Sequence, residues 1–117
     1  MTTKAVADTQ TAAKLFRGFA DPTRLAILRA LAGGELRVTD LIAIVGGSQA
    51  NVSGHVACLK ECGLVMDRHE GRSVFYRIAT PEVVDVLRSA EELLALTGDK
   101  IDLCPNYTAP RRRRQRS

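Results

Sequence analysis

The feature of this sequence that most constrains its fold is the triplet Gly46-Gly47-Ser48, which separates two short apolar segments. The segment before it, 39–45, has apolar residues at helical spacing for barely two turns, and we expect Thr39 to be its N-cap. The segment after it, 49–62, is expected to be a second helix with Ser48 as N-cap. This is the layout of a helix-turn-helix, which also occurs in proteins that bind no DNA.

Helical periodicity also marks three segments outside this unit. The first is 5–20, and the second begins at Asp21-Pro22 and ends at Gly33-Gly34. The third, 81–98, begins with proline and ends with glycine. It carries more apolar surface than one small core needs, so we expect it to form a homodimer interface together with the first helix. Packing of all this surface within one subunit is the alternative.

The period changes between residues 63 and 80. Segments 64–68 and 73–78 are rich in residues that favour strands, and the connector 69–72 contains the glycine that a tight hairpin needs. The sequence therefore predicts a mainly α fold with a β-hairpin, a dimeric winged helix-turn-helix.

The length and charge of the chain favour one domain with a distinct tail. We assign 1–103 to the winged-helix domain, whose small core would gain burial from a second copy, and 104–117 to a flexible tail. The net charge of +4 comes from that tail, which holds five of the 17 basic residues and leaves 12 basic against 13 acidic residues. The arginine-rich end is either a solvated run or a non-specific aid to DNA binding.

Two absences bear on location. No apolar run approaches the ~20 residues that span a bilayer, and the first ten residues lack the apolar stretch of a signal peptide. We therefore expect a cytoplasmic protein with no membrane partner. In a reducing compartment the three cysteines favour thiol or metal chemistry over disulfides.

The predicted recognition helix has one apolar stripe and one small, polar face. At about 100° per residue, the stripe that faces the core consists of Val52, Val56 and Leu59. The opposite face is small enough to enter a major groove of double-stranded operator DNA, where Gln49 and Ser53 would reach base edges. The residues expected to contact phosphates or to brace the turn are Ser48, Asn51 and Lys60.

Three more residues are candidates for this interface. Arg68 and Arg72 flank the tip of the hairpin, and we favour a DNA contact over a solvated loop for Arg72, whereas both interpretations stay open for Arg68. His55 is expected to form a hydrogen bond or to contact DNA rather than to ligate a metal. Two recognition helices of a dimer would read half-sites one helical turn apart, which predicts an inverted-repeat operator.

Cys58 and Cys62 stand at positions i and i+4, so their sulfurs project from adjacent turns and can share one ion. They lie on a shoulder between the core stripe and the DNA-facing surface; small buried hydrophobic residues are the alternative interpretation. Cys104 is the third thiol, and alone it would be an ordinary tail cysteine. Three thiolates suit Cd(II) or Pb(II), and As(III) also fits three thiols.

The order of these elements resembles the ArsR/SmtB family of metal-responsive repressors over roughly residues 12–97. The likeness is carried by Asp21-Pro22-Thr23-Arg24, by Asn51-Val52-Ser53-Gly54-His55 and by the hairpin. The run from Cys58 to Leu64, with a further cysteine in the tail, is similar to the cadmium- and lead-sensing members. This implies that Cys104 closes the site from the tail of the same or the other subunit. Where many relatives carry a Cys-x-Cys pair, this chain has Arg37 and Thr39.

These features predict a repressor that binds DNA as a metal-free dimer and is released by a soft metal ion. A thiol-redox sensor that uses Cys58 and Cys62 is the main alternative, and a winged helix for protein interaction is another. The chain has two histidines, no phosphate-cradling glycine loop and no plausible nucleophile–base pair, so we do not expect an enzyme.

Overall fold

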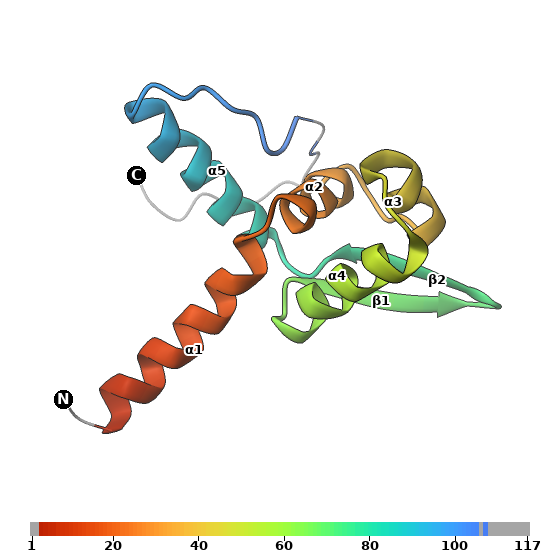
Figure 1. The fold of residues 1–117 in the computed structure, drawn as a ribbon, viewed down its shortest axis with the longest axis horizontal. Coiled ribbons are helices and arrows are strands. Elements are labelled where there is room, and N and C mark those ends of the chain that lie inside the picture. The colour runs from red at the N-terminus through yellow and green to blue at the C-terminus, as the bar shows by residue number, and fades with distance from the viewer. Residues whose placement is uncertain (1–2, 106, 108–117) are drawn as a thin grey trace.

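The computed structural model describes residues 3–105 and 107 of the chain. Along this part of the sequence, helices and strands follow the predicted order of a winged helix-turn-helix (Figure 1). The elements are α1 Thr3–Phe19, α2 Pro22–Leu31, α3 Val38–Val45, α4 Gln49–Glu61, β1 Val65–Glu70, β2 Ser73–Ile78 and α5 Pro81–Leu96. Within the same residues, no helix is long and apolar enough to cross a membrane.

Side-chain caps begin the helices of the central unit. The Asp21 carboxylate accepts hydrogen bonds from the backbone N–H groups of Thr23 and Arg24 at 2.9 and 3.0 Å, and Ser48 Oγ accepts one from Asn51 at 3.1 Å. Both predicted N-caps are thus confirmed.

The expectation that Thr39 caps α3 is wrong. The N-cap is Arg37, with extended backbone, and α3 begins at Val38. The carboxylate of Asp40 reaches back to the N–H of Arg37 at 2.9 Å, which satisfies the helix start from its third position.

The hairpin pairs antiparallel from Val65 opposite Ile78 to Glu70 opposite Ser73. Its two-residue turn places Gly71 at φ +61°, a conformation that favours glycine. A separate bridge ties β2 to the segment before α3, because Leu36 and Tyr76 exchange two backbone hydrogen bonds of 3.1 and 2.8 Å. The wing is therefore fastened at its middle to the helix-turn-helix.

The core lies where α2, α3, α4, β1 and α5 meet. Its buried apolar side chains are Ile27, Leu28, Leu31, Leu41, Val52, Val56, Leu59, Leu64, Val65, Val83, Val84 and Leu87. The predicted stripe of α4 belongs to this set, as its spacing requires. Cys104 also belongs to it, because the chain beyond α5 turns back towards α2 (Figure 1).

Apolar side chains on α1 and α5 stay exposed in the single chain. α1 projects away from the rest of the molecule (Figure 1). The exposed set comprises Val6, Leu15 and Phe16 on α1, and Val86, Leu93, Leu94 and Leu96 on α5. This is the surplus surface that the sequence predicts for these two helices.

Candidate DNA interface and thiol site

An open groove of about 410 Å³ lies between the helix-turn-helix and the wing. Gln49 and Ser53 line it from the first turns of α4, and Arg72 lines it from the tip of the hairpin. The structure therefore brings together three residues that the sequence nominates separately. The N-termini of α3 and α4 also lie at this groove, so the positive ends of their helix dipoles add positive potential there.

Arg37 is a further residue of this groove, and sequence reasoning missed it. Its side chain is 50% exposed; its Nε lies 3.5 Å from Asp40 Oδ2 and its guanidinium lies 6.0 Å from the ring centre of Phe75. The sequence analysis considered Arg37 only as a replacement for a family cysteine. A basic residue directly before the first helix of a helix-turn-helix is the signal that could have identified it.

Two basic residues that are predicted to contact DNA form ion pairs with acidic residues of the same chain. Arg68 donates from Nε to both oxygens of Glu35 at 2.9 and 3.0 Å, pairs with Glu70 at 3.1 Å, and stacks 4.8 Å from the Phe75 ring centre. The hydrogen bonds from Arg68 lower the pKa of Glu35 below its usual value. Arg68 is therefore a brace between the wing and the segment before α3.

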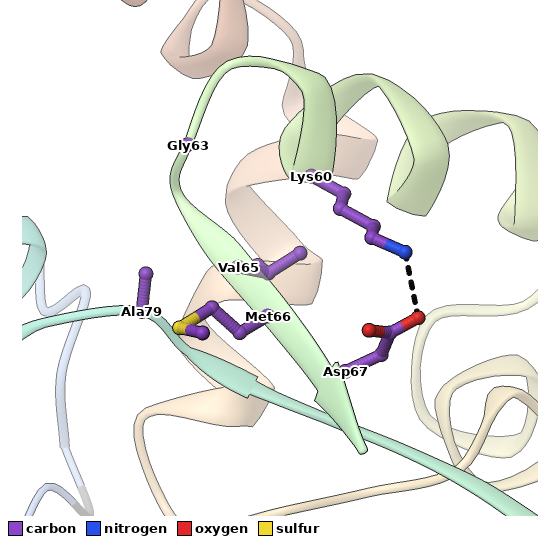
Figure 2. Close-up of a pocket in the computed structure, with 6 residues that line it drawn as sticks. All are labelled: Lys60, Gly63, Val65, Met66, Asp67 and Ala79. Atoms are coloured by element: carbon purple, nitrogen blue, oxygen red, sulfur yellow. Dashed lines mark hydrogen bonds and ion pairs between the residues drawn. The ribbon is translucent and has the colours of Figure 1, made fainter. Parts of the chain in front are cut away.

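Lys60 is likewise paired. Its Nζ lies 2.7 Å from Asp67 Oδ2, and this bond lowers the pKa of Asp67 and raises that of Lys60. Figure 2 shows the Lys60 side chain directed at Asp67 on β1; both residues line a pocket of about 390 Å³ together with Gly63, Val65, Met66 and Ala79. The ion pair holds the C-terminal half of α4 to the wing.

His55, on α4, lies against the start of α2. Its Nδ1 lies 3.4 Å from Arg24 Nη1 and 3.8 Å from Asp21 Oδ2, and its side chain is 21% exposed. Arg24 also donates to the backbone carbonyls of Arg17 and Gly18. This polar cluster joins α1, α2 and α4 and gives His55 the hydrogen-bonding role that is expected from the sequence; its contact with DNA stays a prediction.

The two helix cysteines lie together at the end of α4, against α1. The thiols of Cys58 and Cys62 interact, and Cys62 Sγ donates a hydrogen bond to the carbonyl of Lys14. Burial, and then the neighbouring Cys58, raises the pKa of the Cys62 thiol. Gly18 permits this close approach, because a Cβ there would lie 3.5 Å from Cys62 Sγ and 2.7 Å from Leu64 Cδ1. The pair has the soft donor chemistry and the i, i+4 spacing that a thiophilic ion needs.

Cys104 does not join this pair within the chain. It is only 5% exposed and packs in the core, and burial, followed by the charge of Glu91, raises its pKa. Over residues 3–105 and 107, no group of three or more His, Cys, Asp or Glu side chains is placed to hold a metal ion. In the described residues, the thiols of Cys58 and Cys62 therefore lie together, and that of Cys104 is buried at a separate place in the core.

Comparison with known proteins supports the interpretation of the groove. Residues 21–67, from α2 into β1, match the bacterial regulatory protein, arsR family. A probable mercury resistance operon repressor of Streptomyces lividans is 37% identical over 94 residues, which cover 80% of this chain and 75% of that protein. The chain belongs to the arsR family. The HTH-type transcriptional regulator CmtR of Mycobacterium tuberculosis is 44% identical over 89 residues, 75% of each chain.

A solved structure of a possible ArsR-family transcriptional regulator has the same architecture. The homodimeric winged helix-turn-helix DNA-binding domain Mb0332 of Mycobacterium bovis superposes with a TM-score of 0.75 at 28% identity, covering 83% of this chain and 90% of that one. ArsR-family proteins such as these relatives are DNA-binding transcriptional regulators and not enzymes. The groove and the thiol pair of this chain therefore lie on the scaffold of a transcriptional regulator.

Proposed function

We propose that this arsR-family protein is a repressor that binds operator DNA as a metal-free homodimer and is released by Cd(II) or Pb(II). The observation that carries the proposal is the placement of two functions on one helix. The first turns of α4 line the groove through Gln49 and Ser53, and its end carries Cys58 and Cys62. A change at the end of the helix is thereby transmitted along a rigid element to its start.

The residues that line the groove suit two different kinds of DNA contact. In this proposal Gln49 and Ser53 read base edges, whereas Arg37, before α3, and Arg72, at the tip of the hairpin, contact phosphates. Ser48 caps α4 by accepting the N–H of Asn51, and both residues stay our candidates for phosphate contacts or for bracing the turn. Lys60 and Arg68 contribute less directly, since acidic partners offset their charges.

Dimerisation is supported by the exposed apolar faces of α1 and α5. Burial of such surface contributes about 25 cal/mol per Å², so a second copy would stabilise both helices. The M. bovis relative is described as homodimeric. Two copies related by a two-fold axis would bind an inverted repeat.

The thiols support metal sensing. Cys58 and Cys62 would hold the ion, with Cys104 as a third ligand from the same or the partner chain. A bound soft cation links thiolates that are otherwise separate. Cys62 gives up its proton on binding and no longer donates to Lys14, so the end of α4 repacks against α1. By linkage, DNA must weaken metal binding by the factor by which metal weakens DNA binding.

Titration of promoter-bound protein with Cd(II), Pb(II), Zn(II) and As(III), followed by fluorescence anisotropy, tests this proposal. We expect Cd(II) or Pb(II) to release the wild-type protein, and Cys58→Ser and Cys62→Ser to remain bound. Equal operator affinity with and without all four ions would reject metal sensing. Because the two thiols lie at i and i+4 and interact, a redox-sensing repressor is the second candidate. Release by peroxide without a thiolate-to-metal absorption band would favour it.

A further inference from the structure

The chain beyond α5 forms a short strap, residues 102–105, that is fixed to the rest of the fold by polar contacts. Glu91 Oε2, on α5, accepts the backbone N–H groups of both Leu103 and Cys104, the second at 3.1 Å. Arg29 Nε, on α2, donates to the carbonyl of Asp102 at 3.0 Å. One carboxylate oxygen therefore receives two consecutive N–H groups, immediately before and at the cysteine.

The strap determines what Cys104 can do. Its own chain already covers Cys104 to 5% exposure, and a partner subunit can only cover it further. A thiolate must come within roughly 2.3–2.6 Å of a metal ion to bind it. A sulfur packed among core side chains offers no such approach, so Cys104 cannot act as a ligand in its docked position.

We propose that Glu91 is a positioning residue that keeps Cys104 docked in the core, where it cannot bind metal. Release of the strap from Glu91 then limits the metal affinity of the thiol site. The inference rests on the proposed role of Cys104 as third ligand. When only a fraction of molecules is competent to bind, the apparent affinity falls by that fraction.

The chain offers a matched pair of acidic residues for the test. Glu91→Ala removes the acceptor that both N–H groups share and leaves the Cys104 N–H only its longer bond of 3.3 Å to Asp102 Oδ1, whereas Glu91→Gln keeps an oxygen in the same place. Glu92→Ala changes the next residue of α5, an exposed glutamate. Alanine is a strong helix former, so α5 should persist in each alanine variant.

The first measurement needs no metal. In the Cys58→Ser/Cys62→Ser background, Cys104 is the only thiol, and its alkylation by iodoacetamide can be followed by mass spectrometry. We expect Glu91→Ala to accelerate alkylation by about tenfold or more, since two hydrogen bonds to a charged acceptor are lost. Glu91→Gln should lie closer to the parent, and Glu92→Ala should match it. Equal rates for Glu91→Ala and Glu92→Ala would overturn the inference.

The second measurement uses the full chain with all cysteines. A competition titration with Cd(II), read by the thiolate-to-metal band, should show tighter binding in Glu91→Ala by a factor similar to the gain in alkylation rate. An affinity unchanged by Glu91→Ala, in a protein whose Cd(II) binding needs Cys58, would overturn this inference alone. Cd(II) binding that survives Cys58→Ser and Cys62→Ser would reject the proposed function instead, while the alkylation rates would still decide whether Glu91 holds Cys104.

Discussion

The thiol of Cys62 donates a hydrogen bond to the backbone carbonyl of Lys14 over 3.4 Å. The bond joins residues 48 positions apart and ties the end of the recognition helix to α1. α1 also bears the exposed Phe16, part of the apolar surface that we assign to a dimer interface. A proposed metal ligand is thus a structural contact of the metal-free protein.

This double role predicts different effects for two substitutions of Cys62. Serine keeps a donor for the Lys14 carbonyl but is a poor ligand for soft ions, whereas alanine loses both properties. We expect Cys62→Ala to lower the free energy of unfolding by roughly 1 kcal/mol and Cys62→Ser by less. Urea unfolding of the metal-free proteins measures the difference. If alanine is as stable as the wild type, the bond to Lys14 does not stabilise the fold.

Two helical glycines should respond in opposite ways to alanine. At Gly18 a Cβ would lie 2.7 Å from Leu64 Cδ1, inside the junction of α1 with α4, so Gly18→Ala should destabilise by about 1–3 kcal/mol. At Gly54 a Cβ would meet nothing within 4 Å, so Gly54→Ala should be neutral or stabilise by up to roughly 1 kcal/mol. Thermal unfolding provides the comparison, and a stable Gly18→Ala variant would show that Leu64 adapts freely.

Salt dependence should separate the two kinds of groove residue. Removing a phosphate contact with Arg37→Ala or Arg72→Ala should reduce the slope of log affinity against log salt by about one. Gln49→Ala should instead lose about 1–3 kcal/mol at the operator with the slope unchanged. Lys60→Ala, whose charge Asp67 already offsets, is the control and should change the slope little. A larger change for Lys60 than for Arg37 would reverse our assignment.

Metal affinity should rise with pH. Burial, and then Cys58, raises the pKa of Cys62, so this thiol keeps its proton at neutral pH and must lose it to bind. The log of Cd(II) affinity should increase between about pH 6 and pH 8 with a slope near two, or near three if Cys104 also ligates. A flat profile would rule out thiolate ligation.

The same raised pKa makes the free energy of unfolding of the metal-free protein fall as pH rises, whereas metal affinity increases. The folded protein favours the protonated thiol, so the contribution of Cys62 is complete below its unfolded pKa and is lost as pH rises through its folded pKa. Unfolding measured in the presence of a chelator, from neutral pH to above the ordinary thiol pKa of about 8.5, checks that sign.

Local sequence signals were enough for most of the fold. Asp21, Ser48 and Gly71 act within a few residues, as caps or a turn, and each lies where its pattern predicts. The stripe of α4 follows from helical geometry alone. Thr39 was misplaced because the side chain that caps the start of α3, Asp40, lies inside the helix and reaches back to the N–H of Arg37.

The contacts of the site required the structure. His55 turns to Arg24, 31 residues away, and Cys104 is held by Glu91, 13 residues earlier. Nothing in the periodicity of either segment encodes these partners, because they are fixed by how helices pack. The sequence predicts all three thiols as ligands. It could not show that Cys58 and Cys62 lie together while Cys104 is buried in the core.

The backbone bridge between Leu36 and Tyr76 bears on how the protein would meet its operator. Leu36 directly precedes Arg37, and Tyr76 lies on the strand that follows Arg72, so the bridge sets the spacing of the two groove walls before any DNA arrives. A wing on a loose hinge would lose conformational entropy on binding, whereas a tethered wing loses little. The groove is therefore preorganised before DNA binds. We expect the protein to prefer operator DNA that bends easily into this groove, in addition to reading its base edges.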